Sequence, residues 1–220
     1  MNKKSIILLS GGLDSLVCLG TQREYYNIEL ALTFNYGQKS AKYEIEAASK
    51  LAEYYNVTHK VIELPFLREI TNTSLVSDTE VPETNLYTQE SAKAVWVPNR
   101  NGLFLSIAAA YADSYEYTHI IFGANREEGE TFPDNTEEFG DILTKSFEYS
   151  TLTRPKIYAP LISMDKGDIV RLAIEEHLPL ELTRSCYSSG TKNCGKCESC
   201  KHLKDALMKN GAKKYIEVLF

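Results

Sequence analysis

The segment Ser5-Ile6-Ile7-Leu8-Leu9-Ser10-Gly11-Gly12-Leu13-Asp14-Ser15 is the most informative part of this chain. Residues 5–9 form a short run of Ile and Leu, of the kind that is buried on both faces of a parallel sheet. A helix-compatible stretch follows from about residue 15 to residue 26. The Ser-Gly-Gly turn therefore lies at the carboxyl end of a first strand, where α/β sheets bind their ligands.

Strand-like and helix-like segments alternate along the rest of the chain. We expect strands at residues 29–34, 58–63, 119–122 and 157–161, and helices at residues 41–55, 101–113, 136–147, about 165–177 (capped by Ser163 or Asp165) and 201–209. Residues 64–97 are rich in Thr, Asn, Ser, Glu and Pro, and a loop of that length is usually functional. The alternation predicts an α/β fold with a doubly wound parallel sheet.

The composition fits one sizeable domain with a small appendage. The 220 residues are 43% hydrophobic, which is enough for a core. Twenty-four basic and 30 acidic residues give a net charge of −6, which argues against a dedicated nucleic-acid binder. No apolar run approaches the roughly 20 residues of a membrane span, and the first apolar stretch is too short for a signal peptide. We expect a cytoplasmic protein without membrane contact.

Residues 10–15 have the features of a phosphate-binding loop. Two glycines let the backbone approach an anion, and the start of the following helix offers unpaired N–H groups. The hydroxyls of Ser10 and Ser15 can donate to phosphate oxygens, and Asp14 could hold a magnesium ion. The loop is neither a Walker motif nor a dinucleotide fingerprint. From these residues alone, a plain turn between strand and helix is an equal alternative.

Four cysteines cluster near the end of the chain, at Cys186, Cys194, Cys197 and Cys200. Their spacing suits a closed tetrahedral zinc site, which would be structural because no position stays open. A four-iron cluster is the alternative, although the Cys-Pro that usually ends such runs is missing. We interpret His202 as a bystander and Cys18 as a small core residue of the first helix.

Several segments together resemble the 7-cyano-7-deazaguanine synthase family of the ATP pyrophosphatase superfamily. The Ser-Gly-Gly-Leu-Asp-Ser motif resembles the superfamily's pyrophosphate loop. Further matching segments are residues 34–39, 97–101, 104–106 and 123–125, Pro160-Leu161 with Lys166, and Ser185-Cys186-Tyr187 with residues 194–200. The resemblance spans nearly the whole chain, and a cysteine tail behind a pyrophosphate loop is a specific combination. It favours zinc over an iron–sulfur cluster.

The resemblance implies an adenine nucleotide alpha hydrolase-like fold and an ATP-dependent carbon–nitrogen ligase. Such an enzyme converts 7-carboxy-7-deazaguanine and ammonia to the 7-nitrile through an adenylated acid and an adenylated amide, for queuosine biosynthesis. ATP with Mg²⁺ would be the co-substrate, one structural Zn²⁺ would be bound per chain, and a homodimer is implied. Residues 1–180 would form the pyrophosphate-loop domain, and residues 181–220 a zinc-binding helical tail.

The resemblance also assigns roles to individual residues. The leaving pyrophosphate and ATP would be held by Ser10, Gly11, Gly12, Leu13, Asp14, Ser15 and Lys166. Asp14, Lys166 and Arg100 are the catalytic candidates, and the planar fork of Arg100 suits a carboxylate or a phosphate. Tyr36, Gln38, Arg100, Asn125 and Asp134 are the expected substrate-binding residues. Each assignment has an alternative without a functional role: a solvated helix-start lysine for Lys166, a surface or capping arginine for Arg100, and an ordinary turn for Tyr36 and Gln38.

Residues 129–135 depart from the family pattern, since only Pro133-Asp134 and an aromatic residue at Phe132 are kept. If that stretch shapes the base pocket, the substrate is the weakest part of the match. Two other adenylating enzymes stay open, a tRNA thiolase and an amide-forming amidotransferase. A non-catalytic nucleotide sensor is the third alternative, against which the retained Asp14 and Lys166 argue.

Overall fold

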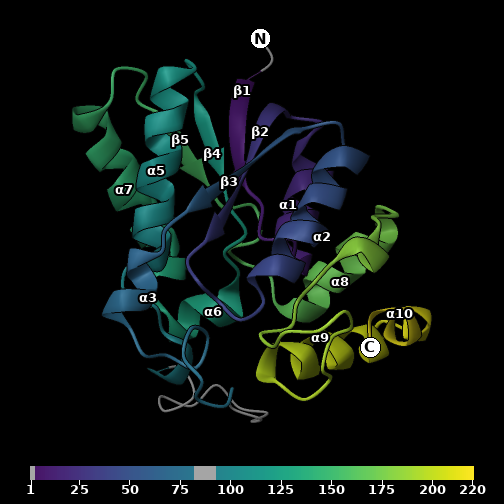
Figure 1. Ribbon diagram of the computed structural model, residues 1–220. Helices are drawn as coiled ribbons and strands as arrows, with labels where there is room; N and C mark the ends of the chain where they lie inside the picture. The colour runs from purple at the N-terminus through teal and green to yellow at the C-terminus, as the bar shows by residue number, and fades with distance from the viewer. Residues whose placement is uncertain (1–2, 82–92) are drawn as a thin grey trace.

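The computed structural model describes residues 3–81 and 93–220 (Figure 1). Within these residues, five parallel strands form one sheet in the order β3-β2-β1-β4-β5. The strands are β1 (Lys3–Leu8), β2 (Tyr26–Asn35), β3 (Thr58–Glu63), β4 (His119–Ile121) and β5 (Lys156–Tyr158). The predicted parallel sheet is confirmed, and β5 ends at Tyr158, three residues before the end of the strand predicted at 157–161.

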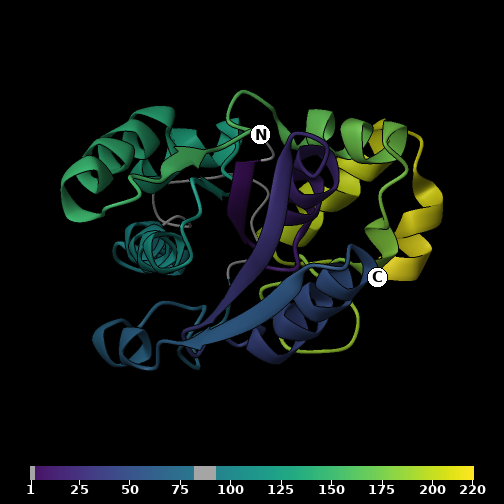
Figure 2. The ribbon, with the colours of Figure 1, turned by 90° about the horizontal axis from the view of Figure 1, so that it is seen from above.

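Helices cover both faces of the sheet, as Figure 2 shows. One face carries α1 (Leu13–Gln22), α2 (Ala41–Tyr54) and α8 (Lys166–Glu175), and the other carries α5 (Arg100–Ser114) and α7 (Glu137–Ser150). Successive side chains of β1 alternate between the two layers: Ile7 packs in the α1 layer and Ile6 in the α5 layer, both fully buried. The doubly wound arrangement is therefore confirmed.

The strand order reverses next to β1, because β2 and β3 extend the sheet on one side and β4 and β5 on the other. Open α/β sheets bind ligands outside the carboxyl ends of their strands at such a switch point. The turns after β1 and β4 touch there. A Cβ on Gly123 would lie 3.1 Å from the backbone carbon of Asp14, so only a glycine fits between them without a shift.

The cysteine tail ends in α9 (Glu198–Lys209) and α10 (Lys213–Leu219), which lie near the carboxyl edge of the sheet in Figure 1. Leu203 and Leu207 of α9 are buried in the same apolar cluster as α1 and α8. The tail thus shares a core with the sheet. No helix among the described residues has the length and apolarity needed to cross a membrane.

Some short elements were not predicted. The helices α3 (Phe66–Ile70), α6 (Arg126–Thr131) and α10 are too short or too polar to show an apolar period, and 3₁₀ turns occupy Pro133–Asn135 and Leu180–Leu182. The N-cap of α8 is Asp165, in a capping box with Asp168. The segment predicted as a loop at 64–97 contains α3, and its residues 82–92 lie outside the described part.

Candidate active site and metal centre

A cavity of about 260 Å³ opens at the switch point. Side chains reach it from the turns after β1, β2 and β4, from the first turns of α5 and α8, and from the cysteine tail. All the residues predicted to bind nucleotide or substrate line this cavity, except Gly11 and Asn125. The family pattern therefore selected residues that are far apart in sequence and close in space.

The two adjacent glycines of the loop have different surroundings. Gly11 has φ +80°, and a Cβ there would lie 2.6 Å from the Glu44 carbonyl oxygen and 2.9 Å from the Ala48 nitrogen of α2. Gly12 lines the cavity as the N-cap of α1, with φ −84°, and a Cβ there would approach nothing closer than 3.4 Å. Gly11 is required for packing, and Gly12 leaves space for a ligand.

The loop hydroxyls lie at the start of α1. Ser10 Oγ and Ser15 Oγ are 3.2 Å apart, Ser15 Oγ donates to the Gly12 carbonyl at 3.0 Å, and Gly12 N donates to Ser10 Oγ at 3.3 Å. No described side chain caps α1. Its first N–H groups and positive dipole end therefore stay available to an anion in the cavity.

A lysine and two carboxylates meet beside this loop. Lys166 Nζ lies 2.7 Å from Asp14 Oδ2 and 3.8 Å from Glu128 Oε1. Burial raises the pKa of Glu128, and the Lys166 charge offsets part of that rise. Burial by itself would lower the pKa of Lys166, but Asp14 and Glu128 hold it above its usual range. Lys166 is therefore a permanent cation in the cavity.

Asn125 is fully buried and lies behind this group. Its Nδ2 donates to Asp14 Oδ2 at 3.4 Å, and its Oδ1 accepts the Glu128 N–H at 3.0 Å as the N-cap of α6. The geometry makes Asn125 a positioning residue for two carboxylates. Glu128 itself was missed from the sequence, although Asn-Arg-Glu-Glu at 125–128 has the spacing of a helix start.

Arg100 begins α5 and meets the turn after β2. Its Nη1 donates to the Tyr36 hydroxyl at 3.3 Å. Burial alone would lower the pKa of Arg100, but the neighbouring Tyr36 and Asp134 hold it above its usual range. Arg100 and Tyr36, both predicted to bind substrate, thus meet in the cavity wall, where the guanidinium of Arg100 carries a full positive charge.

Two predicted substrate-binding residues are already hydrogen-bonded to protein groups. Gln38 Nε2 donates to the Phe34 carbonyl at 3.1 Å and to Glu44 Oε2 at 2.8 Å, and its Oε1 accepts the Tyr36 N–H. Asp134 Oδ2 accepts the Asn101 N–H at the start of α5, at 3.2 Å. Burial raises the pKa of Asp134 against the opposing charge of Arg100. Both residues hold turns in place at the cavity edge.

Aromatic rings form flat walls of the cavity. Phe34 and Phe104 stack with centroids 4.0 Å apart and an interplanar angle of 4°. Trp96 and Phe132 are almost parallel, at 9°, with centroids 5.8 Å apart. All four rings line the cavity, so they offer faces to a planar heterocycle. Phe132 is the aromatic residue kept in the divergent stretch.

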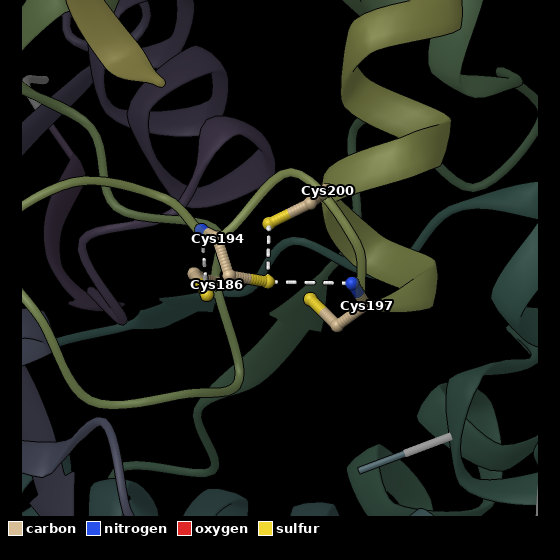
Figure 3. A group of neighbouring side chains, drawn as sticks. All are labelled: Cys186, Cys194, Cys197 and Cys200. Carbon is tan, nitrogen blue, oxygen red and sulfur yellow. Dashed lines mark hydrogen bonds between the residues drawn. The ribbon is translucent and has the colours of Figure 1, made fainter. Parts of the chain in front are cut away.

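The four cysteines converge at the start of α9 (Figure 3). Their sulfurs all lie within 4.8 Å of one another, and Cys194 Sγ and Cys200 Sγ are 3.8 Å apart. Zinc–sulfur bonds of about 2.3 Å in a tetrahedron place sulfurs about 3.8 Å apart. The arrangement therefore fits one four-coordinate ion.

Backbone N–H groups also point at these sulfurs. Cys186 Sγ accepts from Ser188 N and Cys194 N, each at 3.3 Å, and Cys194 Sγ accepts from Cys197 N at 3.3 Å. N–H donors of this kind favour the charged form of a thiol. Thiolates are the form in which cysteine binds metal ions.

One further residue of the cavity wall was missed from the sequence. Arg184 precedes the first cysteine by two residues, is 6% exposed, and lines the cavity. Its backbone N–H donates to the Gly11 carbonyl at 2.8 Å. No pattern in the sequence connects residue 184 to the loop at residues 10–15, because their contact depends on the folded tail.

The family model for the queuosine biosynthesis protein QueC matches residues 4–211 of this chain. The chain belongs to that family. A 7-cyano-7-deazaguanine synthase of Carboxydothermus hydrogenoformans is 47% identical over 210 residues, which cover 93% of this chain and 98% of the relative. The synthase of Methanosarcina barkeri is 45% identical over 221 residues, 96% of each chain. Because these QueC-family relatives are synthases, the family is one of enzymes, and the resemblance inferred from the motifs is confirmed.

Solved structures of more distant proteins share the fold. The U34-tRNA thiolase NcsA of Methanococcus maripaludis with its 4Fe-4S cluster aligns at a TM-score of 0.51 and 20% identity, covering 99% of this chain and 70% of that one. A 4-thiouridine synthetase in complex with RNA and ATP aligns at a TM-score of 0.52 and 18% identity, covering 99% and 53%. This QueC-family chain therefore has the expected adenine nucleotide alpha hydrolase-like fold.

Proposed function

We propose that this protein is a 7-cyano-7-deazaguanine synthase, an ATP-dependent carbon–nitrogen ligase that acts on 7-carboxy-7-deazaguanine and ammonia. The observation that carries the proposal is the cavity in which a glycine loop, the Lys166–Asp14 pair and Arg100 meet at the strand switch point. Membership of the QueC family, over residues 4–211, supplies the choice of substrate.

The reaction needs two activations of the same carbon atom. A carboxylate oxygen is a poor leaving group, so it first attacks the α-phosphate of ATP and releases pyrophosphate. Ammonia then displaces AMP and gives the amide. The amide oxygen attacks the α-phosphate of a second ATP and releases pyrophosphate, and loss of AMP and both protons of the nitrogen leaves the nitrile. Both oxygens of the acid leave on AMP, so one site that adenylates an acid and an amide is sufficient.

The residues in the cavity match the charges of these steps. The uncapped start of α1, with the hydroxyls of Ser10 and Ser15, offers donors to the departing pyrophosphate. Lys166 stays protonated in the cavity and would neutralise part of that charge. Arg100, held by Tyr36, would pair with the substrate carboxylate through its planar fork. The stacked rings of Phe34 and Phe104 would hold the base of the substrate.

Asp14 and Glu128 are the carboxylates that would hold the Mg²⁺ of ATP, an ion that binds oxygen ligands and neutralises phosphate charge. We assign the four-cysteine centre to one structural Zn²⁺. A four-iron cluster has one iron for each thiolate and spreads its sulfurs further apart than a single ion does. The close approach of Cys194 Sγ and Cys200 Sγ, 3.8 Å, supports the single ion.

Mass spectrometry of one incubation tests the proposal. Purified protein would be mixed with magnesium ATP, ammonium and 7-carboxy-7-deazaguanine. We expect the nitrile to appear, with AMP that depends on the acid. Amide without nitrile would restrict the activity to the first activation and make the protein an amide-forming ligase. No turnover by folded, metal-loaded protein would overturn the assigned substrate.

Asp14→Asn and Asp141→Asn form a matched pair for the assay, since each removes one carboxylate charge. Asp14 lines the cavity, whereas Asp141 is exposed on α7. We expect both variants to fold, AMP formation to be lost in Asp14→Asn, and the Asp141→Asn rate to stay within about twofold of wild type. AMP release retained by Asp14→Asn would remove Asp14 from the mechanism. The expected homodimer and cytoplasmic location stay predictions, and light scattering would test the first.

A further inference from the structure

The guanidinium of Arg184 is buried without a full set of partners. The residue is 6% exposed, and its Nη2 donates to the Ser188 carbonyl at 2.7 Å. Its Nε and Nη1 are buried and have no hydrogen-bond partner among the described residues. Leaving buried charged donors unpaired is destabilising. A ligand with acceptor oxygens in the adjoining cavity would satisfy them.

The position of Arg184 indicates which ligand that is. Its backbone N–H is bonded to the Gly11 carbonyl, and its own carbonyl oxygen lies 3.6 Å from the Cβ position of Gly12. The guanidinium carbon lies 5.3 Å from the centre of the Tyr43 ring of α2. Arg184 therefore reaches the glycine loop from the α2 side, while Lys166 reaches it from the β4 side.

The acidic side chain of Glu44 in α2, whose charge interacts with that of Arg184, is already engaged. The two carboxylate oxygens of Glu44 accept from Gln38 Nε2 at 2.8 Å and from Ser40 Oγ at 2.5 Å. Burial raises the pKa of Glu44, and the charges of Arg100 and Arg184 oppose that rise. Arg184 makes no ion pair within the described residues, so its charge remains available to an external anion.

We propose that Arg184 is an anion-binding residue of the active site, which donates Nε and Nη1 to the β- and γ-phosphate oxygens of the nucleotide and to the leaving pyrophosphate. This assignment rests on the proposed use of ATP. Nε and Nη1 lie on different edges of the planar guanidinium, so they can donate to oxygens of two separate phosphate groups, a spread of donors that the single ammonium of lysine lacks. With Lys166 on the other side, the pyrophosphate is bound between two cations above the open end of α1.

The metal centre holds this arginine in position. Arg184 and its acceptor Ser188 lie two residues before and two residues after Cys186, and Ser188 N donates to Cys186 Sγ at 3.3 Å. The short segment that supplies the first metal ligand therefore also fixes the guanidinium. A centre without catalytic chemistry of its own would in this way determine how tightly the phosphates are bound.

Isothermal titration of metal-loaded protein with magnesium pyrophosphate tests the assignment, with adenosine as a phosphate-free probe. In Arg184→Met we expect pyrophosphate affinity to fall about 10- to 100-fold, the loss of one or two hydrogen bonds to a charged donor, with adenosine affinity within twofold of wild type. Arg184→Lys keeps the charge but has one ammonium in place of the guanidinium donors, so its pyrophosphate affinity should lie between those of wild type and Arg184→Met. Lys209→Met removes an exposed charge from the same tail and should change neither affinity.

Wild-type pyrophosphate affinity in a folded Arg184→Met, or in Arg184→Lys if the first variant does not fold, would overturn the assignment. Equal losses for adenosine and pyrophosphate would also overturn it, since they indicate a packing role. Because the titration uses no deazaguanine, its result can be interpreted even if the protein does not synthesise the nitrile.

Discussion

The same substitution at two neighbouring positions, Gly11→Ala and Gly12→Ala, separates the packing role of the loop from its binding role. At Gly11 the methyl group would enter α2, 2.6 Å from the Glu44 carbonyl oxygen, on a backbone with φ +80°. At Gly12 it would enter the cavity, with no atom closer than 3.4 Å. We expect Gly11→Ala to lose stability and Gly12→Ala to lose nucleotide binding.

The magnitudes follow from these surroundings. An alanine in the left-handed region costs about 1–2 kcal/mol, and overpacking against backbone that cannot move aside adds about 1–3 kcal/mol. The total of about 2–5 kcal/mol corresponds to a fall in Tm of about 4–20 °C for a domain of this size. At Gly12 the smaller entropy of the unfolded alanine chain offsets the weaker N-cap, so stability should change by less than about 1 kcal/mol.

Thermal unfolding and ATP-dependent pyrophosphate release, measured on both variants, form the assay. Gly12→Ala should keep the wild-type Tm within about 4 °C and raise KM for ATP at least about tenfold, the loss of one hydrogen bond to a charged group. A Gly11→Ala variant that unfolds within 2 °C of wild type would refute the crowding argument. An unchanged KM in Gly12→Ala would refute the placement of phosphates over this loop.

Three further variants test the charges and the metal. Lys166→Met should lose about 2–4 kcal/mol of the free energy of unfolding at pH 8, because Asp14 and Glu128 lose their shared cation. Burial raises the pKa of Glu128, so the folded state binds its proton more tightly than the unfolded state does, and stability falls as pH rises from the usual carboxylate pKa to the raised one. Without the charge of Lys166 that pKa rises further, so the variant loses more stability at high pH than the wild type does. The deficit should therefore shrink towards pH 5 in denaturant titrations, and an equal deficit at both pH values would contradict the account. Cys194→Ala should fail to yield soluble, metal-loaded protein, whereas Cys18→Ala should keep one metal ion per chain by emission spectroscopy; a soluble Cys194→Ala with normal metal content would disprove the structural role.

The sheet could be predicted because its strands are short apolar runs in regular alternation with helices. The predicted strand at 58–63 coincides with β3, and that at 29–34 lies within β2. α6 could not be predicted in the same way. Its sequence Arg-Glu-Glu-Gly-Glu-Thr has no apolar period, and the helix depends on the buried Asn125 cap. Such elements are fixed by tertiary contacts, which local patterns do not contain.

The candidate site was predictable to the extent that its chemistry is carried by a motif. Asp14 and Lys166 were found in that way, and they lie 2.7 Å apart although 152 positions separate them. Glu128 has the sequence context of a surface helix, and Arg184 that of a tail residue. Both become site residues only when distant segments fold onto the loop at residues 10–15. Charged residues in polar segments give no sequence signal of this kind.

The bond from Arg184 N to the Gly11 carbonyl has a consequence for synthesis of the chain on the ribosome. The glycine loop is made first, but the segment that covers it comes some 170 residues later. At about 5–20 residues per second, the interval is roughly 10–30 seconds. During this interval the central strand is available for pairing while the cavity lacks one wall. A nascent chain therefore completes the cavity only when residues 181–220 have emerged and folded.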